Sequence, residues 1–377
     1  MHKCAQARRD SLPNLIFTIG YYMETNIFQK EALDIKPALL SKIVDEILRE
    51  KEVTRNGVTS ATGASATSVR KVFSALNHCG FTEEVSRPRL NSAKPCGHLC
   101  LREQVSVLIL DLSAPIFGIG LMDSQHRCVL YEQHVYDREM TLSDNLIVFF
   151  SRVKPLIKKS RLGFCSVGVI CADKELSSVQ ARNPALPTVS QDKETLDDLI
   201  RKIFGAVPTV YADLGDALRY AIHYNVLSVP GEDPDSAYIF VGSDLYAIAL
   251  PDKKAPIPIR LSGLMPTSKT QLKDRMQVFH SKYSISNVLW RAGNLLDCML
   301  NMRHLIVEYD FEKFDITALH RMHKAFSVTG HPEPVISTHK KAPGFAAIGL
   351  SLACIASLIL SHFAHAPAQP EGEEHIR

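Results

Sequence analysis

The chain has 377 residues, a length that allows two or three domains and a sizeable buried core. Apolar residues make up 46% and charged residues 22%, and the net charge of +3 is too small to imply or to exclude a nucleic-acid partner. The nine cysteines form no regular framework and their number is odd, so we expect a reducing, cytoplasmic environment rather than a disulfide-stabilised secreted fold.

Residues 1–34 are expected to form an N-terminal extension, either an extra helix or a disordered arm. Arg8 and Arg9 precede an apolar run that resembles a weak secretion signal. Pro13 interrupts the run and no small-residue cleavage site follows it, so we do not expect export.

Three helices are predicted next. The stretch 37–50 carries one apolar stripe at helical spacing. The stretch 53–63 predicts a short helix that Gly63 ends in a left-handed cap. Ser65 is a natural N-cap for a third helix, which Gly80 stops. Three helices with a glycine corner before the third are typical of a helix-turn-helix.

Two strands follow, with a turn near 91–95, and three basic side chains lie where a wing would touch phosphates. Residues 35–100 are therefore predicted to form a winged helix-turn-helix DNA-binding domain. An ordinary three-helix bundle is the alternative, but it would have no reason to place a polar helix start and a basic ribbon on one side. The candidates for base contact are Ser65, Ala66, Thr67 and Ser68, and those for phosphate contact are Arg55, Arg70, Lys71, Arg87, Arg89 and Lys94.

One local pattern has metal-ligand spacing: Cys96 and Cys100 flank His98. His78 and Cys79 could complete a set of four ligands. Small residues in a β-ribbon explain the pattern better, so no metal and no cofactor are expected.

From Val105 onward the pattern predicts an α/β domain over residues 104–377. Three strands are followed by alternating helices and strands, and the same order begins again near Ala237. This repetition predicts two similar lobes, about 104–230 and 231–377, which would face each other across a ligand-binding cleft. The expected strands are 105–112, 116–123, 128–136, 164–171, 209–212, 237–243, 246–250, 257–261, 304–309 and 334–338, and the expected helices are 142–158, 194–203, 216–224, two between 269 and 300, 316–326 and one from 345.

The stretch from Gly344 to Ser361 contains no charged residue. Eighteen such residues meet the lower length limit for a membrane-spanning helix. The stretch is rich in Gly, Ala and Ser and lacks aromatic belts, so a helix buried against a sheet explains it as well.

The order of elements resembles the duplicated actin-like, sugar-kinase-like fold, in which each lobe is ribonuclease H-like. With a winged helix-turn-helix in front, the chain resembles the transcriptional regulators of the ROK family, such as the N-acetylglucosamine and xylose repressors. The resemblance covers residues 35–360 and rests on the helix-turn-helix, on "VLILDLSAPIFGIGLMD" and "VYADLGDALRYA", and on "GFAAIGLSLA".

The resemblance implies where a kinase site would lie. The family's first phosphate loop matches Asp111 to Pro115, where both glycines are gone, and only Gly242 remains of the second. Asp213 matches the catalytic base, although an aspartate at a strand end is more often a helix cap. The segment matching the family's sugar-contact motif, Arg260 to Gly263, lacks its Glu and His, and no Cys-rich zinc loop follows. Catalysis is therefore not expected, and Asp111, Asp213 and Gly242 remain ligand-binding candidates.

The sequence thus predicts a cytoplasmic DNA-binding regulator of sugar-related or other metabolic genes. Its partners would be double-stranded DNA with a palindromic operator, further copies of itself in a homodimer or homotetramer, and a small-molecule effector whose identity stays open. Two alternatives remain open: a divergent sugar kinase, and a membrane-tethered regulator or interaction protein that uses the C-terminal apolar helix.

Overall fold

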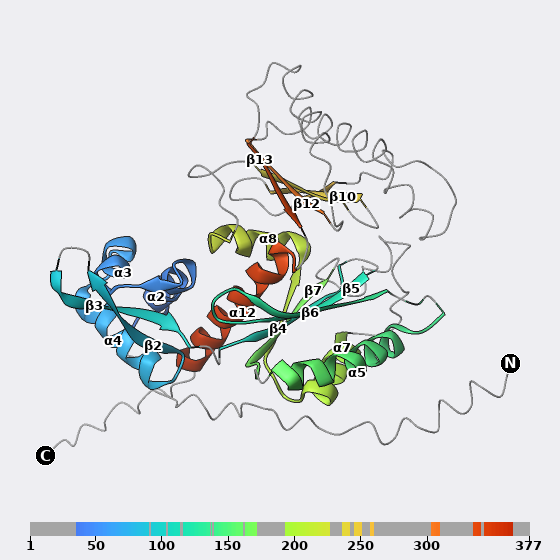
Figure 1. The fold of residues 1–377 in the computed structure, drawn as a ribbon, viewed down its shortest axis with the longest axis horizontal. Coiled ribbons are helices and arrows are strands. Elements are labelled where there is room, and N and C mark those ends of the chain that lie inside the picture. The colour runs from blue at the N-terminus through green and yellow to red at the C-terminus, as the bar shows by residue number, and fades with distance from the viewer. Residues whose placement is uncertain are drawn as a thin grey trace, which may run out of the picture.

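The structure is a computed structural model. It describes residues 35–89, 92–102, 105–113, 116–135, 137, 139–160, 163–171, 193–226, 236–241, 245–250, 257–259, 303–309, 335–340 and 343–364. Figure 1 shows a small N-terminal unit beside a body that contains two separate sheets. We call the elements between residues 35 and 102 the head and the remainder the body.

The head is a helical layer against a small antiparallel sheet of order β1-β3-β2. Its elements are α2 (Pro37–Arg49), β1 (Glu52–Val53), α3 (Arg55–Thr62), α4 (Ala66–His78), β2 (Thr82–Arg89) and β3 (Ser92–Leu101). The predicted wing turn near 91–95 is wrong in extent, because Arg89 already pairs with Ser92 and β3 includes 92–95.

Local signals set the ends of the head helices. Thr54 begins α3 by accepting a hydrogen bond from the Gly57 amide at 3.0 Å. Gly63 ends it in the left-handed conformation, with φ of 67°, as predicted. Ser65 then caps α4, so the corner between the two helices spans only three residues.

The first body sheet has the order β6-β5-β4-β7-β8. Its strands are β4 (Val107–Asp111), β5 (Ile116–Met122), β6 (Cys128–Val135), β7 (Ser166–Cys171) and β8 (Thr209–Asp213), accompanied by α5 (Leu142–Ser160), α7 (Lys193–Phe204) and α8 (Leu214–His223). Both faces are buried, and alternate side chains of β4 enter different cores. Leu108 and Leu110 pack with α5 and α7, whereas Val107 and Ile109 belong to the core that includes α8.

The second sheet repeats the first, with the order β11-β10-β9-β12-β13. Its strands are β9 (Ser236–Val241), β10 (Leu245–Leu250), β11 (Ile257–Ile259), β12 (His304–Tyr309) and β13 (Val335–Lys340). In each sheet three antiparallel strands are extended by two parallel ones on the side of the first strand. The predicted duplication is therefore confirmed. The helices expected between 269 and 300 and at 316–326 lie outside the described residues.

The last described helix, α12 (Phe345–Ala364), is the apolar C-terminal segment. By length and composition it is the one helix in the described part of the chain that could cross a membrane. Here it is mostly buried in the protein: it packs on α8, on β7 and β4, and on α2 of the head. Figure 1 shows it running between the first sheet and α8 toward the head.

Candidate nucleic-acid interface

The outward face of α4 is polar and basic. Thr67, Arg70, Lys71 and Ser74 are exposed along it. The opposite face is buried and consists of Val69, Val72, Phe73, Ala75 and Leu76. Because residues three and four apart share a helix face, the burial of one side leaves a continuous polar stripe on the other.

The predicted base-contact residues at the start of α4 divide into two kinds. Ala66 and Thr67 are exposed, and no helix cap engages them. The Ser65 hydroxyl accepts a hydrogen bond from the Ser68 amide at 3.1 Å, and the two serine hydroxyls lie 2.9 Å apart. Ser65 and Ser68 therefore cap the N-terminus of α4, whereas Thr67 between them is exposed.

Sequence reasoning missed two members of this stripe, Ser74 and Asn77. Both are exposed on α4 and follow Arg70 at helical spacing. Extending the spacing from Arg70 through the last turn would have identified them. They lengthen the candidate surface beyond the first turn of the helix.

Arg55, a predicted phosphate contact, begins α3 and forms a salt bridge to Glu84 on β2. Its Nη2 lies 3.7 Å from Glu84 Oε1, and the two side chains are 52% and 49% exposed. A pair this exposed is weak in water. Arg55 is therefore exposed at the surface. Any phosphate that it contacted would also lie close to the Glu84 carboxylate.

The predicted wing contacts lie on the β2–β3 hairpin. Arg87 and Arg89 belong to β2 and Lys94 to β3, near a shift in the pairing register between Arg87 and Arg89. Their side chains lie outside the described part. The backbone places all three toward the far end of the hairpin, away from the pairing of β1 with β3.

The body's ligand candidates lie at one edge of the first sheet. Asp111 ends β4 and Asp213 ends β8, and these parallel strands are separated only by β7. With strands spaced about 4.8 Å apart, the two positions lie about 10 Å from each other. Gly242 lies outside the described residues, as does the segment Arg260 to Gly263.

Both carboxylates already have local partners. Asp111 is buried and its Oδ1 accepts hydrogen bonds from the Ser113 amide at 3.0 Å and from the Ser113 hydroxyl at 2.5 Å. Asp213 is the N-cap of α8, with its Oδ1 2.7 Å from the Asp216 amide. The helix therefore begins at Leu214, two residues earlier than expected. Among the residues that the structure describes, no three His, Cys, Asp or Glu side chains converge as metal ligands.

Comparison with known proteins gives a likeness of fold. No family model matches the sequence, and no curated protein matches it. The crystal structure of a ROK family transcriptional regulator, a homolog of the E. coli MLC protein, superposes with a TM-score of 0.56 at 11% identity, covering 88% of this chain and 100% of that one.

Two ROK sugar kinases superpose on a smaller share of the chain. A glucokinase from Streptomyces griseus, in complex with glucose and AMPPNP, has a TM-score of 0.47 at 12% identity and covers 66% of this chain and 99% of its own. A hexokinase from Thermus thermophilus has a TM-score of 0.43 at 10% identity, with coverage of 68% and 99%. The superposition at a TM-score of 0.56 and 11% identity establishes a shared fold and no activity.

Proposed function

We propose that this chain, which has the fold of a ROK-family transcriptional regulator, is itself a DNA-binding transcriptional regulator. The observation that supports this is the exposed stripe of α4, where the small polar side chains of Thr67 and Ser74 flank Arg70 and Lys71 beside a two-stranded ribbon. In this proposal residues 1–34 are an N-terminal extension, residues 35–100 of the head form the DNA-binding domain, and residues 104–377 form a degenerate kinase-like domain.

In the proposed complex α4 lies in the major groove. Thr67 and Ala66, near its N-terminus, would approach base edges, and Arg70 and Lys71 would neutralise phosphates. The hairpin would contact the adjacent backbone through Arg87, Arg89 and Lys94. A two-fold dimer would set two copies of α4 about one DNA turn apart and select a palindromic operator.

Selection of bound duplexes from a random pool by the full chain tests this directly, since it yields the operator if there is one. On that operator, Arg70→Gln and Lys71→Gln should each lower the salt slope of the affinity by about one unit. Lys158→Gln removes the same charge from an exposed position on α5 and should leave the slope unchanged. No enrichment at low ionic strength, or equal slopes for all three variants, would contradict the proposal.

The proposed body is not a kinase. In support, Ser113 and Ala114 replace the two phosphate-loop glycines, Pro115 removes an amide donor beside them, and the Asp213 carboxylate caps α8. Phosphoryl transfer requires positioned phosphate loops, a metal and a base together. We expect no ATP-dependent turnover over a panel of hexoses and amino sugars with magnesium. Turnover that Asp213→Ala abolishes would favour the divergent kinase instead.

The body would serve dimerisation and effector sensing, and the protein would work in the cytoplasm. Burial of α12 against α8 and the first sheet supports this location, because a helix whose apolar residues are already covered has little left for lipid. Fractionation tests it: recovery only in a detergent-extractable membrane pellet would favour the tethered alternative.

A further inference from the structure

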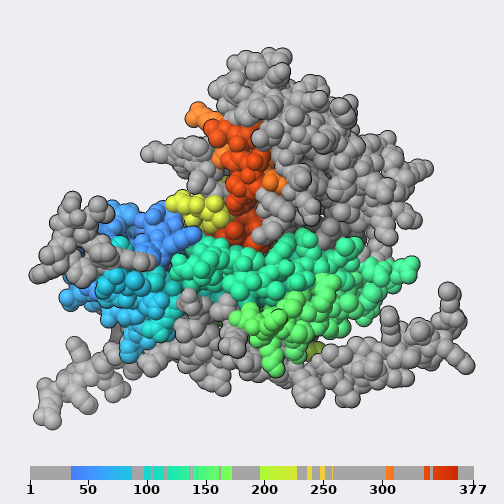
Figure 2. Space-filling view, viewed as in Figure 1, coloured from blue at the N-terminus to red at the C-terminus, as the bar shows by residue number. Residues whose placement is uncertain are grey.

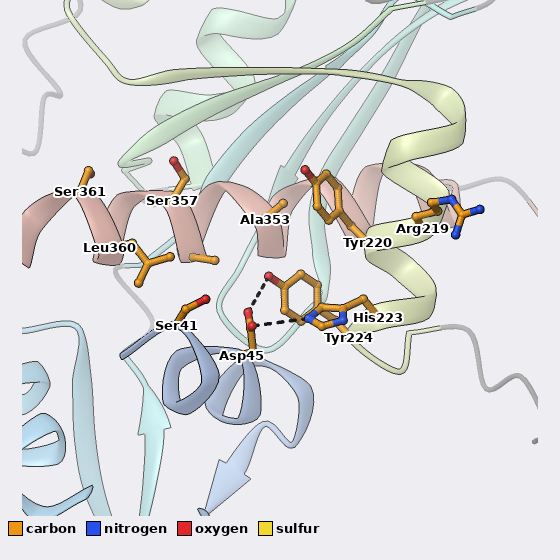
Figure 3. Close-up of a pocket in the computed structure, with 11 residues that line it drawn as sticks. Ser41, Asp45, Arg219, Tyr220, His223, Tyr224, Ala353, Ser357, Leu360 and Ser361 are labelled. Carbon is orange, nitrogen blue, oxygen red and sulfur yellow. Dashed lines mark hydrogen bonds and ion pairs between the residues drawn. The ribbon is translucent and has the colours of Figure 1, made fainter. Parts of the chain in front are cut away.

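A groove of about 710 Å³ lies where the head meets the body. Helix α2 of the head forms one wall, and α8 and α12 of the body form the others, as Figure 3 shows. Figure 2 shows the head against the body at this junction. The groove is separate from the carboxyl edge of the sheet that holds Asp111 and Asp213.

Small side chains on α12 account for the space. Ala353, Ala356 and Ser357 line the groove, and Leu360 extends its apolar floor by one turn. Helices whose contact residues are larger fill such a gap with side chains. Here the floor stays apolar and open to a molecule of modest size.

One acidic side chain projects into this groove. Among the described residues that line it, Asp45 of α2 is the only carboxylate. Its Oδ1 accepts from the Tyr224 hydroxyl at 3.3 Å, and its Oδ2 lies 3.7 Å from Nε2 of His223. Both distances exceed those of strong charge-assisted hydrogen bonds, so the carboxylate retains capacity for a better donor.

The surroundings of Asp45 are partly buried and partly aromatic. Burial, together with the Asp45 charge, raises the pKa of Tyr224 above its usual range. Tyr220 lines the same groove and is 36% exposed. Neither nearby arginine is directed at Asp45: Arg49 Nε donates to the His223 carbonyl at 3.1 Å, and Arg219, which also lines the groove, points away from Asp45 in Figure 3.

We propose that this groove binds a small organic cation, an ammonium group on an apolar body. The ammonium would donate to Asp45, tyrosine rings would face its charge, and the apolar body would lie on Ala353, Ala356 and Leu360. A neutral hydroxyl in the same position would gain less, because it lacks the charge that Asp45 complements.

The site would regulate the head, a consequence that rests on the proposed function. Asp45 belongs to the head, whereas Tyr224 and His223 belong to the body, and their contacts help hold the two together. An ammonium that binds Asp45 competes with those contacts and changes the strength of the association between the head and the body. Since coupling is reciprocal, DNA and the cation must then alter each other's affinity.

Calorimetric titration of the full chain with phenethylamine tests the site without DNA. Its neutral and anionic counterparts, 2-phenylethanol and phenylacetate, should bind at least about tenfold more weakly, and Asp45→Asn should weaken phenethylamine by a similar factor. Ser357→Phe, which fills the groove from an exposed position, should abolish binding. Tyr224→Phe removes the competing donor and should strengthen binding by about twofold to fivefold.

Several results would overturn the site: no binding of phenethylamine, equal binding of 2-phenylethanol, or unchanged binding in Asp45→Asn that is folded by circular dichroism. Weaker binding of phenethylamine to Tyr224→Phe would contradict the proposed competition between the Tyr224 hydroxyl and the ammonium for Asp45. Phenethylamine should also shift operator affinity in the wild type and leave it unchanged in Ser357→Phe. If phenethylamine binds without changing operator affinity, the proposed regulation is contradicted but the binding site is not. If the protein binds no DNA, the proposed function is contradicted, and the calorimetric test of the binding site still holds.

Discussion

Gly349 of α12 lies directly against Ala221 of α8: a Cβ added at Gly349 would come within 2.4 Å of the Ala221 backbone nitrogen. These two helices occupy equivalent places, since each follows the last strand of its sheet. Their close contact joins the second lobe to the first. Only a glycine allows the two backbones to approach this far.

Gly349→Ala should therefore destabilise the protein. Helix propensity alone favours alanine by about 1 kcal/mol, whereas forced overpacking costs about 1–3 kcal/mol. Because the obstructing atoms are backbone, we expect the second effect to win. Urea unfolding measures the difference, with Ser357→Ala on the exposed side of α12 as the control. A Gly349→Ala protein more stable than wild type would show that the helices separate readily.

Glu308 anchors the beginning of α12. It is 2% exposed, its Oε1 accepts from the Phe345 amide at 3.1 Å, and its other oxygen accepts from the Tyr238 hydroxyl. A helix N-terminus favours an anion, and this one is occupied by the chain's own carboxylate. Glu308→Ala should cost about 2 kcal/mol or more, because two buried donors lose their acceptor.

Glu308→Gln retains one carbonyl acceptor, so its free energy of unfolding should lie between those of Glu308→Ala and the wild type. Denaturant titration of both variants checks the order. Equal stability of Glu308→Ala and wild type would mean that other groups cap α12.

Glu84 should oppose DNA binding under the proposed function. It pairs with Arg55 at 3.7 Å and would face the phosphates beside it. Glu84→Gln frees Arg55 and removes a like charge, so affinity should rise by about twofold to fivefold at low salt. Glu139→Gln, an exposed change in the first lobe, is the matched control. Fluorescence anisotropy on the selected operator measures both, and identical gains would indicate an effect of net charge only.

His126 should make stability depend on pH. Burial first and the Lys51 charge second lower its pKa to about 4, although Asp123 opposes them, and its Nε2 is buried without a hydrogen-bond partner in the part of the chain described. Its unfolded pKa is about 6.5, so between pH 6.5 and 4 the unfolded chain binds more protons. Stability attributable to His126 is complete above pH 6.5 and is lost as the pH falls toward 4.

The expected loss is about 1–3 kcal/mol, measured as the difference between urea titrations at the two pH values. His126 has φ of 63°, a conformation that asparagine tolerates, so His126→Asn is the control without the titrating group. An equally steep pH dependence in His126→Asn would assign the effect to other residues.

Local patterns were sufficient for most of the helices and strands that the structure describes. The corner before α4 follows from Gly63 and Ser65, whose roles depend only on backbone conformation and on hydrogen bonds to near neighbours. The wing turn was misplaced because Asn91 and Pro95 favour turns, whereas pairing of Arg89 with Ser92 decides where the strand begins. The role of Asp213 could not be predicted from the sequence, because an aspartate at the end of a strand can be either a catalytic base or a helix cap.

The sequence by itself determined the order of the elements, the repetition of the two lobes and the polar face of α4, because each depends on periodicity within a short segment. Only the tertiary structure decided that the apolar C-terminal helix is buried against protein, and that Asp45 meets Tyr224 across 179 residues of sequence. Hydropathy indicates that a helix avoids water without saying what covers it, and no local pattern specifies a contact between distant segments.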